Sequence, residues 1–466
     1  MDDALWQAAS PAIEQMVNAA HTYIDGGGWC LQDHLPTVSH EHHWPWLNVE
    51  RWGDGRPKDW SSLLGKREGE FTKIAVEELH AYQEFLAYGR SREDLRGKLL
   101  PTEDMALEWL SDMMLDHLSR DVFERAMHIG ARKPHEFRPI YCEAERSILA
   151  DELPGSVIIP LAFAVFPDGW TLRLDDNTCI RPLTDEEHLG RARDYTYGAV
   201  PESVINAATH AIILDDIVVD NRAPWDRVLG RRKYEESAIP QERIDRAVRA
   251  LRVASPTQSG YAQILLAPEG WADHWRLDLP PLMTIDIVRR YPPALDKRSH
   301  REAVTPPSDG NLADIAAAYA ALGRGDKRLN LATRRLDLAT HREESDDAVL
   351  DVTVGLEALI GGDRNEIAHR IATRAAVLLR ETHHAHDIYT YLKKVYDRRS
   401  EIVHGSHSIK NATIRMHDRT FRTEDVALWL LRTVISAAIA LDEPIDTAAL
   451  DRKVLTLIDQ SVRPEA

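Results

Sequence analysis

The last third of the chain carries a sustained helical pattern, in which apolar residues recur every three or four positions. The pattern predicts helices at residues 312–322, 327–340, 345–359, 365–379, 387–403 and 424–441, with a short one near 451–458. Short connections between successive helices are typical of an antiparallel bundle. The long exception runs from Gly405 to Arg422, where we expect a loop that contacts a ligand or substrate.

The middle of the chain has a different period, which changes near Tyr141. A continuous apolar run at 157–166 is typical of a buried strand, Pro167-Asp168-Gly169 predicts a turn, and 170–174 alternates as a returning strand. Further strands are predicted at 210–219, 261–267, 275–279 and 283–288, and helices at a Thr184–Glu187 capping box and at 241–253. Because strands and helices do not alternate regularly, this region reads as a small α+β domain.

The first 140 residues are predicted to be mostly helical. Helical spacing begins at Phe71, breaks at Pro101, and resumes in a second long helix that Thr102 caps and Gly130 ends. An irregular stretch that follows the first helix is rich in tryptophan and histidine: Trp29, Trp44, Trp46, Trp52, Trp60, His34, His40, His42 and His43. Imidazoles are good metal ligands. However, the histidines lack Cys or carboxylate partners at helical spacing, so a lid or contact surface is the favoured interpretation.

The predicted fold class is therefore α+β, with an N-terminal helical and mixed α/β region followed by a C-terminal all-α antiparallel bundle. The predicted domains are residues 1–140, 141–305 and 310–466. A proline-rich, charged segment without periodicity, residues 291–310, is the expected linker. The length of 466 residues is consistent with two or three domains.

Charge and cysteine content limit the classes of function. A formal charge of -18 argues against a general nucleic-acid coat protein, because an acidic surface repels phosphate. Residues 361–410 depart from this balance, with nine Lys/Arg against six Asp/Glu. This basic window suits either one phosphate site or an ordinary solvated helix face. The three cysteines have no metal-site spacing, and we expect neither a metal nor a cofactor. The few cysteines, the acidic start and the lack of a membrane-length apolar run predict a cytoplasmic protein.

The end of the helix predicted at 387–403 carries the clearest chemistry. It reads Tyr-Asp-Arg-Arg-Ser-Glu-Ile-Val-His-Gly from residue 396 to residue 405, and Gly405 is a typical helix stop. A histidine titrates near neutral pH and an arginine keeps its charge, so Arg399 and His404 together suit a phosphate. On an ideal helix they point about 140° apart. The alternative is structural, with His404 capping the helix and Arg399 in an ion pair.

Several segments, in order, resemble a known family. Arg-Leu-Asp-Leu-Ala begins at residue 335, Ser-Asp-Asp-Ala-Val-Leu-Asp at residue 345 and Glu-Ile-Ala-His-Arg at residue 366, and the Tyr-x-x-Arg-Ser-x-x-Val-His-Gly stretch ends the series. This order is similar to the Apea-like branch of the HEPN superfamily, over residues 310–445. One departure is Ser406, where some HEPN groups have a tyrosine.

The resemblance implies a homodimeric, metal-independent RNA endonuclease that leaves a 2′,3′-cyclic phosphate. It assigns His404 as general acid/base, Arg399 as phosphate clamp and Ser400 as an orienting residue. In the basic window, Arg398, Lys393 and Lys394 are the expected substrate-binding residues. It also implies that the N-terminal part senses an unknown trigger, and that the protein acts as a toxin or anti-phage effector. The alternative is a non-catalytic HEPN module that dimerises or binds a nucleotide or partner.

Two carboxylates are candidates for support of this site. Asp346 and Glu357 are eleven residues apart, which places them within about 20° of one helix stripe. Glu357 lies among apolar residues, and a partly buried carboxylate needs a partner. That partner is either Arg399 or His404 on one interpretation, or Arg370 or Arg374 on the other.

Overall fold

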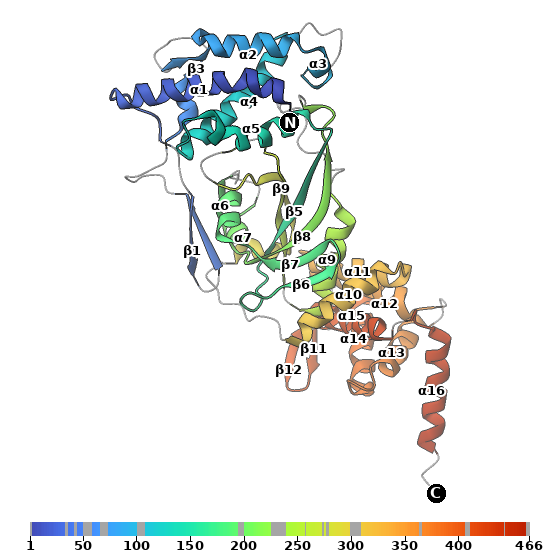
Figure 1. Ribbon diagram of the computed structural model, residues 1–466. Helices are drawn as coiled ribbons and strands as arrows, with labels where there is room; N and C mark the ends of the chain where they lie inside the picture. Colours follow the sequence, from blue (N-terminus) through green and yellow to red (C-terminus); the bar gives the residue numbers. More distant parts are fainter. Residues whose placement is uncertain are drawn as a thin grey trace.

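The computed structural model has three layers of structure along its length (Figure 1). It describes residues 2–32, 36–41, 44–49, 58–65, 73–99, 108–193, 200–224, 239–256, 258–272, 275, 279–298, 309–362, 366–405, 411–441 and 443–462. An N-terminal helical layer lies at one end, an antiparallel sheet in the middle, and a C-terminal helix bundle at the other end. The chain is thus mixed α/β.

The N-terminal layer is built from amphipathic helices that share one core. They are α1 (Asp3–Asp25), α2 (His80–Ser91), α3 (Glu93–Leu99), α4 (Glu108–His128) and α5 (Pro134–Leu149). Their buried faces form a hydrophobic cluster that includes Ile13, Phe85, Phe123 and Tyr141. The predicted change of period near Tyr141 is therefore wrong, because α5 continues to Leu149 with Tyr141, Ala144 and Ile148 on its buried face. Gly130, with φ of +71°, follows α4 as the expected stop.

The segment between α1 and α2 corrects two predictions. The stretch expected to be irregular forms an antiparallel hairpin of β1 (Pro36–Glu41) and β2 (Trp44–Val49). The helix expected from Phe71 begins only at His80, since Ile74 and Ala75 form a strand instead. The smaller elements here are η1 (Trp60–Leu63), β3 (Leu64–Gly65), β4 (Ile74–Ala75) and η2 (Val76–Glu78). Phe71 and Thr102 lie outside the described residues.

The central sheet has six antiparallel strands in the order β10-β9-β5-β8-β7-β6. They are β5 (Glu152–Ala162), β6 (Leu172–Asp175), β7 (Thr178–Pro182), β8 (His210–Asp220), β9 (Gly260–Pro268) and β10 (Met283–Arg290). The returning strand predicted at 170–174 is β6, but it pairs with β7 and not with β5. The reason is a hairpin turn at Asp176-Asn177 that the sequence pattern did not reveal. Phe163, with φ of +56°, follows the end of β5, earlier than the predicted end at 166.

Helices cover both faces of the sheet. They are α6 (Asp185–Arg193), α7 (Glu202–Asn206) and α9 (Gln241–Ala254). The predicted capping box at α6 is confirmed, because the Glu187 backbone N–H donates to Thr184 Oγ1 and the Thr184 N–H donates to Glu187 Oε2. The strand predicted at 275–279 is absent at Trp275 and Leu279, and 276–278 lies outside the described residues.

The expected linker is ordered at its start. Tyr291 and Leu295 are buried against the sheet, and η4 (Pro293–Lys297) lies between β10 and the bundle. The prediction of a linker from residue 291 is therefore wrong for this part, because two of its apolar side chains join the core. Residues 299–308 are outside the described part of the chain.

The C-terminal bundle follows the predicted helices closely. It comprises α10 (Asp309–Gly323), α11 (Lys327–Thr340), α12 (Ser345–Ile360), α13 (Ile367–Leu378), α14 (Ala385–Val403), α15 (Thr423–Ala440) and α16 (Thr447–Val462). The long connection after Gly405 contains a hairpin that was not predicted, formed by β11 (Thr413–Met416) and β12 (Arg419–Arg422). The last helix, α16, extends away from the bundle toward the C-terminus (Figure 1).

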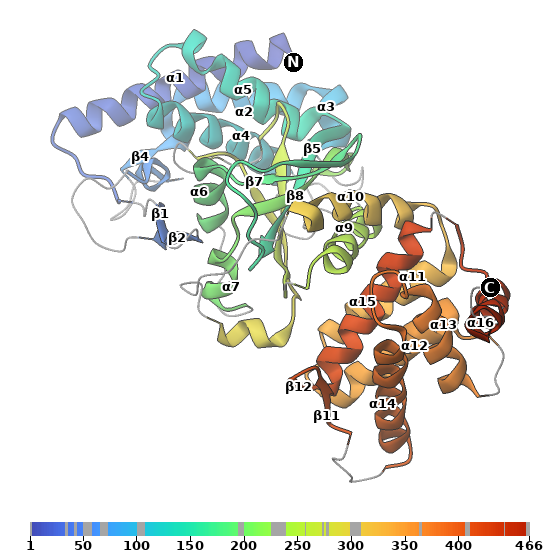
Figure 2. The ribbon, with the colours of Figure 1, turned by 90° about the horizontal axis from the view of Figure 1, so that it is seen from below.

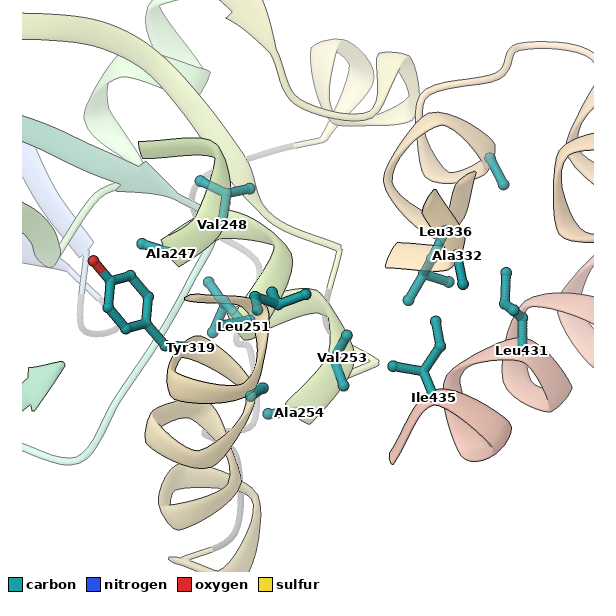
Figure 3. Packing of buried hydrophobic residues seen from close by; sticks show 14 of the residues in the cluster. Ala247, Val248, Leu251, Val253, Ala254, Tyr319, Ala332, Leu336, Leu431 and Ile435 are labelled. Carbon is teal, nitrogen blue, oxygen red and sulfur yellow. The ribbon is translucent and has the colours of Figure 1, made fainter. Parts of the chain in front are cut away.

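The sheet and the bundle share one continuous hydrophobic cluster. Helix α9 packs on the sheet and also on α10, α11 and α15, so it lies between the two layers (Figure 2). Figure 3 shows this packing, with Val253 of α9 near Ile435 of α15 and Ala247 of α9 near Tyr319 of α10. The sheet and the bundle are therefore held together by buried apolar surface, in addition to the covalent connection between them.

Candidate functional site

Helix α14 ends where the sequence predicts. His404 follows the last helical residue, and its backbone N–H donates to the Ser400 carbonyl at 3.1 Å. Gly405 then takes φ of +64°, a left-handed conformation that glycine adopts without a steric penalty. The side chain of His404 is exposed at this helix end, as is the neighbouring Val403. The chain therefore presents an imidazole to solvent from a backbone position that the helix end holds.

Arg399 lies five residues earlier and is loosely held. Its side chain is 36% exposed, and its Nη2 is 3.6 Å from Oε1 of Glu357 on α12. Glu357 Oε1 also accepts a long hydrogen bond of 3.5 Å from the Tyr396 hydroxyl. These separations are at or beyond the usual limit of a hydrogen bond. Arg399 is thus oriented by a carboxylate but keeps donors available to an anion.

The identity of the Glu357 partner decides between the two interpretations of that residue. Arg399 makes the contact with Glu357, whereas Arg374 forms a bidentate pair with Asp451 at 2.7 Å for both bonds. Burial and the negative Glu357 beside it raise the pKa of Tyr396, so its hydroxyl stays protonated and donates. Of the partners considered, the structure thus brings Glu357 to Arg399.

Arg398 is held much more firmly than its neighbour. Its side chain is 13% exposed and donates to Asp346 at 2.6 Å and to Glu401 at 3.3 Å. Glu401 in turn accepts from the Asn411 amide at 2.7 Å. Asp346 therefore contacts Arg398 and not Arg399, so the two carboxylates of α12 serve adjacent arginines of α14. This network ties Asn411, where the described chain resumes after Gly405, to the last turn of α14.

The remaining predicted site residues lie on α14. Lys393 and Lys394 are half-buried, ten and nine residues before the end of α14 at Val403, and Ser400 is exposed next to Arg399. Ser406 lies outside the described residues. The structure adds Asn411, which the sequence analysis missed because a lone asparagine in a loop carries no pattern.

The tryptophan- and histidine-rich stretch forms no metal cluster within the described residues. His40 Nε2 is 3.0 Å from a carboxylate oxygen of Asp185 at the start of α6. Trp44 is fully buried and packs against Phe163, with ring centroids 5.8 Å apart, so this tryptophan belongs to a core and not to a wet surface. His34, His42, His43 and Trp52 lie outside the described residues.

Comparison of the chain with protein-family models, curated proteins and solved structures finds no match. Within the described residues, no helix has the length and apolar character needed to cross a membrane.

Proposed function

We propose that the protein is an RNA endonuclease of HEPN type, with Arg399 and His404 in its active site. The supporting observation is the contrast at the end of α14. Arg398 is saturated by two carboxylates, whereas Arg399 is partly exposed with one long contact and His404 is exposed five residues later. An arginine with spare donors and a solvent-facing imidazole are what phosphate chemistry requires.

The proposed reaction is attack of a ribose 2′-oxygen on the adjacent phosphorus. His404 accepts the 2′-OH proton, the P–O5′ bond breaks as the P–O2′ bond forms, and the departing 5′-oxygen takes a proton from water, to which the His404 imidazolium later returns its own proton. The products are a 2′,3′-cyclic phosphate and a 5′-OH end. Arg399 binds the non-bridging oxygens, where negative charge develops in the transition state. Glu357 and Tyr396 keep the Arg399 side chain in place.

A second copy of the chain completes the proposed site. Arg399 and His404 point in different directions on one helix, and the resemblance to HEPN ribonucleases implies two Arg/His sets facing each other across a homodimer. Val403, which is 57% exposed beside His404, is an apolar residue that a second copy would cover. In this proposal the first 300 residues control the nuclease, whose activity in the cell arrests growth or blocks phage.

The test is RNA cleavage by the purified full-length protein in excess EDTA. We expect the wild type to cut bulk RNA to products with cyclic phosphate ends. His404→Ala should slow cleavage about 100- to 10,000-fold. His369→Ala is the matched control, since His369 lies on α13 of the same bundle and pairs with Tyr389. Arg399→Ala should also abolish cleavage, with melting temperatures unchanged.

A protein that awaits its trigger would not cut RNA in this assay. Overexpression then decides, because growth arrest that is lost in His404→Ala and kept in His369→Ala supports the proposal. No cleavage together with no growth arrest would overturn it, and would favour the non-catalytic binding module.

A further inference from the structure

A large cavity lies at the junction between the sheet and the bundle. Its volume is about 850 Å³, and its walls come from α9, β9, β10, the end of α10 and one face of α11. This volume falls within the range of about 300–1,000 Å³ that is typical of small-molecule sites. The cavity is separate from Arg399 and His404, neither of which lines it.

The charge of the cavity is opposite to that of the whole protein. Its lining holds seven basic side chains, which are Arg246, Arg249, Arg252, Arg289, Arg290, Lys327 and Arg334. Three acidic side chains accompany them, which are Glu242, Asp245 and Asp337. In a chain of net charge -18, a concave surface with this excess of positive charge concentrates anions.

Two of the three acidic lining residues form ion pairs with arginines of the same cavity. Asp337 pairs with the buried Arg252, which also donates to the Ser259 carbonyl at 3.1 Å. Asp245 pairs with Arg249 at 3.1 Å, one turn along α9. Two acids outside the lining hold further members of the basic set, since Arg289 pairs with Asp296 at 3.0 Å and Arg246 lies 3.7 Å from Asp175. Among the acidic lining residues, the exposed Glu242 is then left for Arg290, Lys327 and Arg334.

Three cations remain available in the lining, and they come from two elements of the fold. Within the described residues, Arg290 of β10 and Lys327 and Arg334 of α11 form no ion pair, and all three side chains are exposed. Arg246 beside them is already partnered, since it lies 4.2 Å from the Tyr319 ring centroid, donates to the Tyr319 hydroxyl at 2.8 Å and is 3.7 Å from an Asp175 carboxylate oxygen. Repulsion among unpaired cations around one cavity is relieved when an anion binds there.

We propose that this cavity binds a small ligand with two or more phosphate groups, in the size class of a nucleoside triphosphate. Unpaired cations on both α11 and β10 suit a ligand with several phosphates, and guanidinium groups bind phosphate oxygens in bidentate fashion. Apolar wall residues, among them Val248, Leu322 and Leu338, leave room for a part without charge. The site goes beyond the proposed nuclease and does not depend on it.

The experiment is isothermal titration calorimetry of the full-length protein with three probes, which are ATP, inorganic tripolyphosphate and adenosine. We expect both phosphate probes to bind and adenosine alone not to bind. Arg334→Gln should weaken binding about 10- to 100-fold, since it removes charge-assisted bonds. Arg328→Gln is the matched control, because Arg328 is exposed on the same helix but does not line this cavity.

Each outcome has a defined meaning. If ATP binds more tightly than tripolyphosphate, the ligand of the cavity is a nucleotide. If the two bind equally, the cavity recognises only the polyphosphate part. The proposal is overturned if neither phosphate probe binds at millimolar concentration, or if Arg328→Gln weakens binding as much as Arg334→Gln. It is also overturned in favour of an RNA site if a short RNA binds through Arg334 and the small probes do not. None of these readouts requires RNA cleavage.

Discussion

The arginines at the junction of α9 with α11 and those at the end of α14 are held in different ways. At the junction, Arg252 is 3% exposed and bonds to a carboxylate, a backbone carbonyl and an imidazole. At the end of α14, Arg399 is 36% exposed and has one contact of 3.6 Å with Glu357. The first arrangement fixes two layers of the fold, and the second leaves a cation available.

This difference teaches how to separate structural from functional cations in an arginine-rich chain. Burial makes an unpaired charge costly, so a buried arginine is retained only with several partners. A partly exposed arginine with one long contact is not required for the fold on these grounds. Arg398 and Arg399 show both kinds of arginine at neighbouring positions. Arg398 is the structural one, since it is mostly buried and pairs with two carboxylates.

The largest expected effect is at the junction. Arg252→Ala should lower the free energy of unfolding by about 3–5 kcal/mol, because it leaves the Asp337 carboxylate without its partner. Urea denaturation at pH 7 measures this change. The control is Arg222→Ala, whose side chain is 76% exposed in its pair with Asp220 and should cost less than about 1 kcal/mol.

A double variant sharpens the same comparison. Replacing both partners, in Arg252→Met with Asp337→Leu, should recover much of the lost stability, since no unpaired charge remains. If Arg252→Ala were no more destabilising than Arg222→Ala, the junction arginine would not hold the layers together.

An intermediate effect is expected at the end of α14. Arg398→Ala should lower the free energy of unfolding by about 1.5–3 kcal/mol. The substitution removes charged hydrogen bonds from a mostly buried guanidinium to Asp346 and Glu401. Arg399→Ala should lower the free energy of unfolding by only about 0–1 kcal/mol, which is the usual contribution of an exposed ion pair. Thermal and urea unfolding of the two variants side by side measure the gap. Equal losses of unfolding free energy in the two variants would contradict the view that Arg398 is structural and Arg399 is not.

The sequence predicted the helices of the bundle better than the strands. The helix at 327–340 is confirmed at its full length, because Leu329, Ala332, Leu336 and Ala339 fill one buried face. The hairpin of β11 and β12 was missed because β12 is exposed throughout and has no apolar alternation to reveal it. The helix α5 was missed as a whole, because Gly130 indicates a helix end and the apolar residues that follow run on into the first strand of the sheet, although Phe137, Tyr141 and Ile148 lie on one buried helix face.

Helical periodicity predicted which carboxylates of α12 belong to the candidate site, but not which arginine each of them contacts. It placed Asp346 and Glu357 on one stripe of α12, and both do face α14. It could not tell which arginine each would meet, since Arg398 and Arg399 are adjacent and the choice depends on how α12 and α14 cross. The basic cavity was also beyond reach, because its cations come from α9, β10 and α11, which are distant in sequence.

The smallest expected effect concerns pH at the junction. Burial, followed by the positive Arg252, lowers the pKa of His341 to about 4, while its ordinary value is 6.5. Between these values the unfolded chain binds more protons than the folded one, so stability falls as pH drops from about 6.5 to about 4. We expect the contribution of His341 to be on the order of 1–2 kcal/mol after allowance for its partial exposure.

The variant His341→Gln isolates this contribution. His188 and His210 are also buried with lowered pKa values, so the wild type and the variant will both lose stability in acid. The difference between their urea midpoints should therefore narrow from pH 7 to pH 4.5, because only the wild type must keep His341 neutral beside Arg252. Parallel curves would mean that the imidazole is solvated, and that the junction is more open to water than the contacts of Arg252 indicate.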